Sequence, residues 1–176
     1  MRTKGMLEPP KSSSWMTPKY IVDGVVKALG EIDVDPCSNS ITSPNVPAKI
    51  VYTEKEDGLS KPWNGRIYMN PPYGDQIRKW AKKWYHEYKE GHMDMGIALV
   101  AARTDTRWWK YFNDTASAAC FVSGRIKFIS PDGSSSGSPT FPSVLVLSDT
   151  QGYKYRRDQF ISVFKNIGNI WIPVKE

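Results

Sequence analysis

The sequence has few of the residues that mark metal, disulfide or membrane proteins. Its two cysteines, Cys37 and Cys120, and its two histidines form no metal-binding spacing and no disulfide framework. No apolar run is long enough to cross a bilayer, and no apolar segment follows Arg2 and Lys4 as a signal peptide requires. We therefore expect a cytoplasmic protein of a reducing compartment, with no metal and no membrane partner.

Positive charge and aromatic rings are plentiful instead. Lys and Arg outnumber Asp and Glu by 24 to 18, a net charge of +6, beside 7 Trp, 9 Tyr and 6 Phe. Cations bind phosphates and rings bind unstacked bases, so this composition favours a nucleic-acid partner. The length of 176 residues suits one well-buried domain. We expect a flexible N-terminal arm at 1–14, which is rich in Pro and Ser, and a single domain at 15–176.

Strand and helix patterns alternate along this domain. The periodicity predicts helices at 18–29, 75–88 and about 160–167, and strands at 31–35, 48–53, 66–69, 95–102, 118–129 (interrupted at 123–125), 141–148 and 170–172. Residues 130–140, with repeated Gly, Ser and Pro, are expected to form a flexible loop. Together these elements predict an α/β fold, a three-layer sandwich whose mixed sheet ends in an antiparallel hairpin.

The most informative stretch is Asn70-Pro71-Pro72-Tyr73, directly after a predicted strand. Prolines cannot continue a sheet, so Asn70 and Tyr73 are held at its mouth. The Asn70 side-chain oxygen and the Pro71 carbonyl can accept both protons of a nucleobase amine, which makes its nitrogen a better nucleophile. Tyr73 offers a flat face for a base taken out of its stack. The alternative is a simple proline turn, but four specified residues after a strand favour chemistry.

Asn70-Pro71-Pro72-Tyr73 resembles the catalytic motif of amino-group methyltransferases that use S-adenosylmethionine. The flanking residues resemble the phage-type DNA N-6-adenine methyltransferase (Dam) family over about 15–148, in four segments: 15–18, 33–37, 57–59 with Trp63, and the motif. The resemblance implies a Rossmann-like methyltransferase fold without a separate target-recognition domain. It also implies methyl transfer to the N6 amine of adenine in DNA, by direct in-line attack of a flipped base, in the host cytoplasm if the protein is phage-encoded. The four motif residues would be catalytic.

The resemblance also implies a site for S-adenosylmethionine. Its residues would be Trp15, Thr17, Pro18, Asp35, Pro36, Cys37, Glu54, Asp57, Gly58, Leu59 and Asn70. Thr17 and Pro18 would hold the methionine end, unless they only begin a helix with Thr17 as its N-cap. Asp35 ends a strand, where α/β folds place ligand contacts, and either accepts from the methionine amino group or only fixes the turn. Asp57 and Leu59 would meet the adenine ring, and Glu54 the ribose.

Two features of the segment after Asp35 depart from other methyltransferases. The glycine-rich loop that most of them place here is missing, because residues 37–40 are Cys, Ser, Asn and Ser. Pro36-Cys37 also resembles the nucleophile of cytosine-C5 methyltransferases. Nothing else of that family's surroundings is present, so we interpret Cys37 as a turn residue.

Candidates for substrate binding are Tyr73, Arg103, Thr104 and Arg125, the last three in segments that also resemble the family. Arg103 either contacts DNA phosphate, braces the motif loop or precedes a helix cap. The basic face of helix 75–88 is either a solvated surface or a phosphate track. The loop at 130–140 and the basic residues Lys154, Arg156 and Arg157 remain for DNA contact, so we expect a short or relaxed target site.

Alternative functions remain open within the same chemistry and outside it. The amine could belong to cytosine N4, RNA adenine or a glutamine amide. A basic aromatic domain could also be a non-catalytic nucleic-acid-binding module. Nucleoside analysis of the product distinguishes the first group, and cofactor titration the second.

Overall fold

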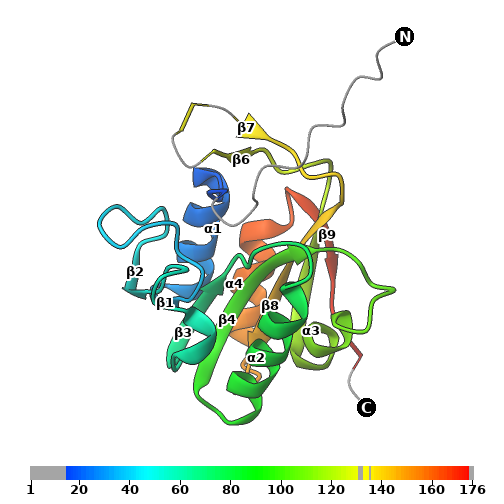
Figure 1. Ribbon diagram of the computed structural model, residues 1–176. Coiled ribbons are helices and arrows are strands. Elements are labelled where there is room, and N and C mark those ends of the chain that lie inside the picture. Colours follow the sequence, from blue (N-terminus) through cyan, green and yellow to red (C-terminus); the bar gives the residue numbers. More distant parts are fainter. Residues whose placement is uncertain (1–14, 131–132, 135, 175–176) are drawn as a thin grey trace.

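The computed structural model describes residues 15–130, 133–134 and 136–174, and the arm expected at 1–14 lies outside them. A seven-stranded sheet in the order β2-β1-β3-β4-β8-β5-β9 runs through the molecule (Figure 1). Its strands are β1 (Ile32–Asp35), β2 (Ala48–Val51), β3 (Gly65–Met69), β4 (Met93–Ala101), β5 (Ala116–Val122), β8 (Ser143–Asp149) and β9 (Gly168–Trp171). The first four strands are parallel, β8 is antiparallel to β4 and β5, and β9 is antiparallel to β5.

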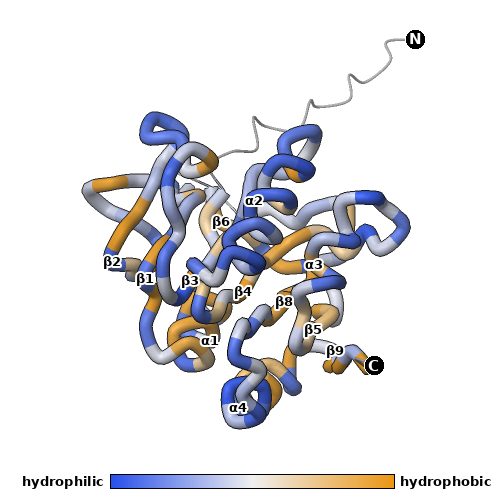
Figure 2. Tube along the Cα trace, turned by 90° about the horizontal axis from the view of Figure 1, so that it is seen from below, coloured by the Kyte–Doolittle hydropathy of each residue, from blue (hydrophilic) through white to orange (hydrophobic). Residues whose placement is uncertain are grey.

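Helices cover both faces of the sheet. They are α1 (Lys19–Leu29), α2 (Ile77–Lys89), α3 (Trp109–Thr115) and α4 (Lys154–Phe164). α1 packs beside α4 on one face, and α2 packs beside α3 on the other (Figure 1). The central strands are hydrophobic, whereas much of the outer surface of α2 and α4 is hydrophilic (Figure 2). The predicted three-layer α/β sandwich with a mixed sheet is confirmed, and it is a Rossmann-like methyltransferase fold.

The central strand β4 shows why its sequence is apolar without alternation. Ile97 and Leu99 pack into the hydrophobic cluster under α1 and α4, whereas Ala98 and Val100 pack into the cluster under α2 and α3. A strand buried on both faces has no solvent side, so its positions are apolar from Met95 onward, and the one charged residue, Asp94, lies near its start. Its second neighbour, β8, is antiparallel, which the apolar run alone does not disclose.

The expected loop at 130–140 contains part of a second, two-stranded sheet. β6 (Phe128–Ile129) pairs with β7 (Ser136–Gly137), and Met16 forms a bridge with Ile129. This β6–β7 hairpin therefore lies against the segment that enters α1 (Figure 1). Within the predicted flexible loop, the structure thus has one short strand, β7, that the sequence did not predict, whereas β6 falls in the predicted strand 118–129. Gly and Ser have low strand propensity, so their sequence does not show the pairing.

The two edges of the sheet differ in what they bring together. We call the edge where β1, β3 and β4 end the carboxyl edge, and the edge where β4 begins and β8 ends the amino edge. From β1 the chain goes to β2 on one side and then to β3 on the other. The crevice between β1 and β3 at the carboxyl edge is thus the point where such sheets bind ligands.

No helix in the described part of the chain is long and apolar enough to span a membrane.

Candidate active site at the carboxyl edge

Asn70 follows β3 directly, and the prolines after it take the chain out of the sheet. Its amide nitrogen donates a hydrogen bond to Thr17 Oγ1 (3.2 Å), and its amide oxygen accepts one from the Tyr73 hydroxyl (3.1 Å). A carbonyl oxygen can accept two hydrogen bonds, so one lone pair of Asn70 Oδ1 is left. The amide is thus fixed at both ends and keeps acceptor capacity.

Thr17 connects the start of α1 to this amide. Its buried hydroxyl shares a hydrogen bond with the buried Tyr68 hydroxyl (2.9 Å) as well as with Asn70. The predicted N-cap role of Thr17 is wrong, because Pro18 occupies the N-cap position and no side chain caps α1. Burial raises the pKa of Tyr68 well above its ordinary value, so its hydroxyl stays neutral.

Asp35 ends β1 in the neighbouring position and is only 3% exposed. Burial raises its pKa from 3.8 to about 7, and a hydrogen bond from the Cys37 N–H (3.0 Å) offsets this only in part. No Lys or Arg of the described residues forms an ion pair with it. A buried carboxylate without a cation is costly, so the site fits a ligand that brings a positive amino group.

These side chains line one small cavity. Its lining is Trp15, Met16, Thr17, Asp35, Cys37, Asn39, Asn45, Val46, Tyr68 and Asn70, and its volume is about 20 Å³. That volume holds one water molecule, so a ligand of cofactor size requires the walls to separate. One wall is Trp15, whose ring lies so close to Gly137 of the β6–β7 hairpin that a Cβ there would be 2.9 Å from it.

The turn at 57–59 packs beside the end of β1. Gly58 lies so close to Pro36 that an added Cβ would be 2.1 Å from the Pro36 carbonyl oxygen. Asp57, in the left-handed region at φ 54°, accepts from the Leu59 N–H (3.3 Å) and so begins the short helix η2 (Gly58–Ser60). Leu59 and Cys37 pack against the same hydrophobic cluster. Two of the segments expected to hold the cofactor are therefore adjacent.

Tyr73 joins the motif to the β6–β7 hairpin. Its half-buried ring packs on Phe141, with ring centroids 4.8 Å apart, and on Phe128 at 6.2 Å. Burial raises the pKa of its hydroxyl, which remains a neutral donor to Asn70. Pro71 is buried and Pro72 is half-buried.

Five of the expected site residues line the cavity, namely Trp15, Thr17, Asp35, Cys37 and Asn70. The other twelve do not: Pro18, Pro36, Glu54, Asp57, Gly58, Leu59, Pro71, Pro72, Tyr73, Arg103, Thr104 and Arg125. Glu54 is exposed in the turn after β2, Arg103 and Thr104 are exposed after β4, and Arg125 is exposed after β5. Five residues that do line it were missed, namely Met16, Asn39, Asn45, Val46 and Tyr68. Tyr68 reads as a core residue, and the only signal of its role is a hydroxyl two positions before Asn70. Asn45 donates to the Thr17 carbonyl (2.9 Å) from a distant loop, which no local pattern shows.

Of the basic residues at 154–157 that we expected to contact DNA, Arg156 is held within the fold. It forms ion pairs with Asp94 (3.0 Å) and Asp149 (3.1 Å) at the amino edge and is only 12% exposed. Lys154 forms an exposed ion pair with Asp158 (2.7 Å), and the Nε of Arg157 is buried without a hydrogen-bond partner among the described residues. DNA contact by Lys154 and Arg157 stays a prediction.

Comparison with known proteins agrees with this geometry. In the described part of the chain, no group of three or more His, Cys, Asp or Glu is placed to hold a metal ion. A comparison with curated proteins finds no match. The family model of DNA N-6-adenine-methyltransferase (Dam) matches residues 5–166. Because that match spans most of the chain and includes every residue of the cavity, the protein belongs to the DNA N-6-adenine-methyltransferase (Dam) family, whose members are enzymes that methylate adenine in DNA.

Proposed function

We propose that this protein transfers a methyl group from S-adenosylmethionine to the N6 amine of adenine in DNA. The observation that carries the proposal is the Asn70 amide, which Thr17 and Tyr73 hold at the end of β3. Asp35, a buried carboxylate without a cation, lines the same cavity from β1. An amine-polarising group and a site for a cationic ligand thus lie side by side at the crevice of the sheet.

The residues around the cavity suit S-adenosylmethionine. Asp35 would accept hydrogen bonds from the amino group of its methionine part, beside the Thr17–Pro18 corner and Trp15. Asp57 would accept from the adenine amino group, Leu59 would pack on the ring, and Glu54 is our candidate for the ribose. The backbone of Pro36, Cys37 and Gly58 shapes the wall between them. When bound, this cofactor supplies an electrophilic methyl group on a sulfonium centre.

The chain's part in the reaction is to orient and polarise the target amine. Asn70 Oδ1 and the Pro71 carbonyl would accept its two protons, which localises the nitrogen lone pair for direct in-line attack. Neither acceptor ionises, and each keeps its position because the prolines stiffen the loop. Preorganised groups of this kind contribute about 100- to 1000-fold each. The adenine must leave its stack to reach them, and the Tyr73 ring is the surface that would receive it.

We also propose that one domain carries out both chemistry and recognition. The elements from α1 to β9 build a single sheet with its covering helices and one hairpin. Specificity depends on side chains that reach base edges, and a short hairpin presents few of them. Sequencing of methylated positions on random-sequence DNA should therefore find a target of a few base pairs, and a strict site of six or more would contradict this.

The decisive experiment uses the full chain with S-adenosylmethionine labelled on its methyl group. After incubation with DNA and digestion to nucleosides, we expect the label in N6-methyldeoxyadenosine. Label in N4-methyldeoxycytidine, in RNA or in protein would replace the proposal by one of the alternative substrates. No transfer to any of them, together with absent cofactor binding in calorimetry, would leave a non-catalytic nucleic-acid-binding module.

A further inference from the structure

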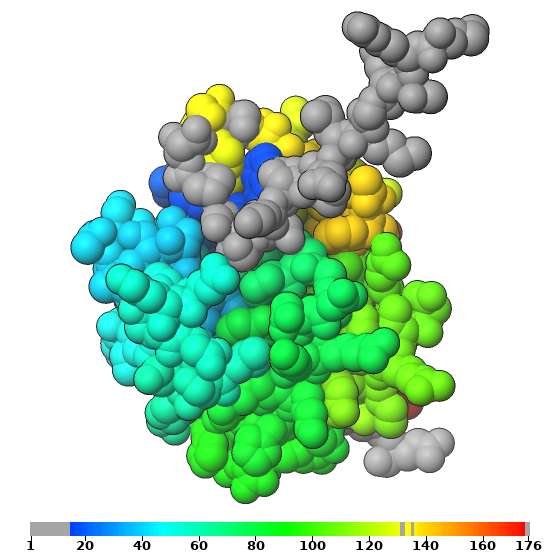
Figure 3. Space-filling model, in the orientation of Figure 1, coloured from blue at the N-terminus to red at the C-terminus, as the bar shows by residue number. Residues whose placement is uncertain are grey.

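A second, larger hollow lies between α2 and α3, next to the motif. It has a volume of about 790 Å³ and is lined by Gly74, Asp75, Ile77, Arg78, Lys79, Lys82, Thr106, Arg107, Trp108 and Tyr111. We call it the α2–α3 groove. It begins at Gly74, the residue directly after Tyr73, and lies on the side of the molecule that faces the viewer in Figure 3. The groove therefore starts one residue after the motif, although it shares no lining residue with the cavity at the carboxyl edge.

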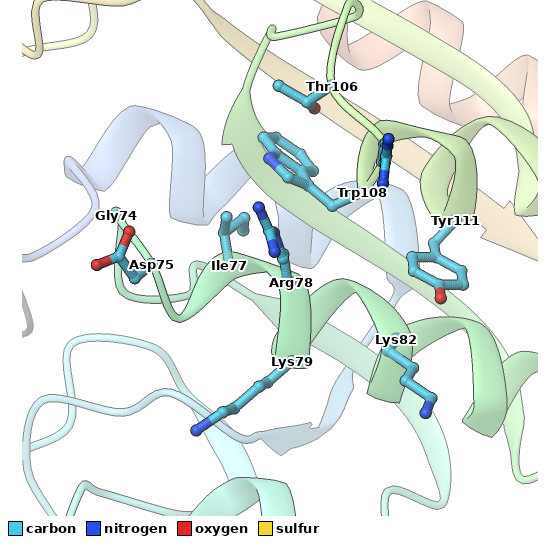
Figure 4. A pocket seen from close by; sticks show the side chains of 10 residues that line it. Gly74, Asp75, Ile77, Arg78, Lys79, Lys82, Thr106, Trp108 and Tyr111 are labelled. Atoms are coloured by element: carbon cyan, nitrogen blue, oxygen red, sulfur yellow. The ribbon is translucent and has the colours of Figure 1, made fainter.

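The lining of this groove is strongly positive. It holds four cations, Arg78, Lys79, Lys82 and Arg107, against one carboxylate, Asp75. Figure 4 shows Arg78 reaching from α2 toward Trp108, and Lys82 on the same side of α2 as Tyr111. The first turn of α2 carries no acidic residue, so the positive end of the helix dipole adds to this field.

The four groove cations are not among the basic residues that form ion pairs. Those residues are Lys19, Lys49, Arg66, Lys83, Lys110, Lys154 and Arg156. Within residues 15–130, 133–134 and 136–174, no carboxylate forms an ion pair with any of the four groove cations. Unpaired like charges gathered in one hollow repel one another, and a polyanion removes that repulsion.

We propose that the α2–α3 groove binds the phosphodiester backbone of the DNA strand beside the target adenine. This inference rests on the proposed function, because it identifies how the substrate of that site is held. The cations of the groove suit phosphates better than its rings suit stacked bases. Trp108 is only 8% exposed, and the half-buried Tyr111 ring packs on Tyr85, with ring centroids 5.4 Å apart. Arg78, Lys82 and Arg107 would each neutralise a phosphate and release counterions.

The test compares two double variants with equal loss of charge. Arg78→Gln with Lys82→Gln removes two groove cations and keeps most of each side chain's length. Lys27→Gln with Lys165→Gln removes two exposed lysines from the opposite face of the sheet, on α1 and just after α4. Binding of each full-length protein to a 20-base-pair DNA is measured by fluorescence anisotropy over a range of salt concentrations. Thermal melting checks that both variants fold.

Loss of two phosphate contacts should reduce the slope of log affinity against log salt by about 1.8, and the affinity at 0.1 M salt by about 60-fold. The control pair should change the slope much less. Turnover at saturating DNA and cofactor affinity should stay as in the wild type, because neither residue lines the cavity at the carboxyl edge.

Each other outcome overturns a distinct statement. Equal slopes and affinities for wild type and groove variant, while wild type methylates DNA, would reject the groove and leave the proposed function intact. The same loss in both double variants would mean that net charge, not the groove, attracts DNA. Groove-dependent DNA binding without any methyl transfer by the wild type would reject the function and keep the groove. A groove effect on single-stranded RNA alone would assign the groove to RNA.

Discussion

The two edges of the sheet each bury a carboxylate, but they treat it differently. At the amino edge, Asp149 is 2% exposed and accepts hydrogen bonds from the Gln151 N–H (3.1 Å) and the Tyr153 N–H (3.0 Å). It also forms an ion pair with Arg156, which reaches Asp94 as well. Groups of the protein itself thus compensate the charge of Asp149. Through these contacts Arg156, at the start of α4, connects β4 and β8.

At the carboxyl edge, Asp35 is equally buried but has far less support. Its carboxylate accepts a hydrogen bond from the Cys37 N–H (3.0 Å), and burial raises its pKa to about 7. We infer from this difference that Asp35, a buried carboxylate that no Lys or Arg of the described residues pairs with, is the candidate for contact with a cationic ligand. The contrast therefore predicts that substitutions at the amino edge change stability, whereas those at the carboxyl edge change binding and turnover.

The largest effect is expected from Arg156→Met at the amino edge. The substitution retains an unbranched apolar side chain but removes the guanidinium group, so that Asp149 is buried without its cation. Breaking a buried ion pair in this way costs about 3–5 kcal/mol of unfolding free energy, and Arg156 is only 12% exposed, so solvent screens little of it. Urea denaturation measures the change. Turnover per folded molecule should stay close to wild type, and a loss of turnover without loss of stability would break the comparison.

The next largest effect is expected from Asn70→Ala at the carboxyl edge. It removes one of the two acceptors for the target amine, so methyl transfer should fall by about 100- to 1000-fold. Cofactor affinity and urea stability should change little. Single-turnover transfer with labelled cofactor measures the rate, and Asn166→Ala, at an exposed position after α4, is the matched control. Near wild-type transfer by Asn70→Ala would reject its catalytic role.

The sequence predicted the layers of this fold because burial of one or both faces of an element determines the spacing of apolar residues along it. The apolar run of β4 follows from packing on both faces of the strand. The helical spacing of Trp80 and Trp84 follows from packing on one face of α2. The motif was also readable, since prolines constrain the backbone locally. The β6–β7 hairpin was not, because its pairing depends on Met16 and Trp15, more than a hundred residues earlier.

Side-chain partners across long sequence separations explain the remaining differences. Thr17 has the local pattern of an N-cap, but its hydroxyl is bound by Tyr68 and Asn70, which are 51 and 53 positions away. Arg156 reads as a free cation, but Asp94 is 62 positions away and pairs with it. A sequence shows which side chains can form a hydrogen bond or an ion pair. Only the fold determines which partner each of them has.

Asp35→Asn should have a smaller effect than Asn70→Ala, and on binding instead of turnover. It keeps the shape and an oxygen for the Cys37 N–H but removes the charge offered to a ligand amino group. Charge-assisted hydrogen bonds contribute about 1.5–3 kcal/mol, so the cofactor dissociation constant should rise about 10- to 150-fold. Calorimetric titration measures it. Asp149→Asn is the matched control at the other edge and should lower stability without changing cofactor affinity.

The pH dependence of Asp35 gives an independent check. Its pKa in the folded protein, about 7, lies above its ordinary value of 3.8, so the folded state binds a proton that the unfolded chain releases. Stability from this group is therefore present below pH 4 and is lost as the pH rises toward 7. Cofactor affinity should rise over the same interval up to pH 7, because the carboxylate form binds the amino group. In Asp35→Asn, neither stability nor cofactor affinity should change with pH over this interval. If both still change as in the wild type, another group is responsible for the titration.

The smallest effect on turnover is expected from Tyr73→Phe, which removes a hydroxyl group at the carboxyl edge and is compared with Tyr155→Phe at the amino edge. Tyr73 donates to Asn70 Oδ1 (3.1 Å), and Tyr155, 65% exposed at the amino edge, accepts from Arg156 Nε (3.2 Å). Tyr73→Phe keeps the ring on Phe141 but releases one end of the catalytic amide. A neutral hydrogen bond contributes about 0.5–1.5 kcal/mol, so turnover should fall about 2- to 10-fold with cofactor affinity unchanged.

Tyr155→Phe removes the same atom at the other edge. It should alter neither turnover nor, beyond about 0.5 kcal/mol, stability, because surface substitutions rarely exceed that. Faster turnover in Tyr73→Phe would mean that its hydroxyl competes with the target amine for Asn70 Oδ1 instead of orienting it. The sign of this one rate change therefore decides whether the amide is held ready for its substrate or held back from it.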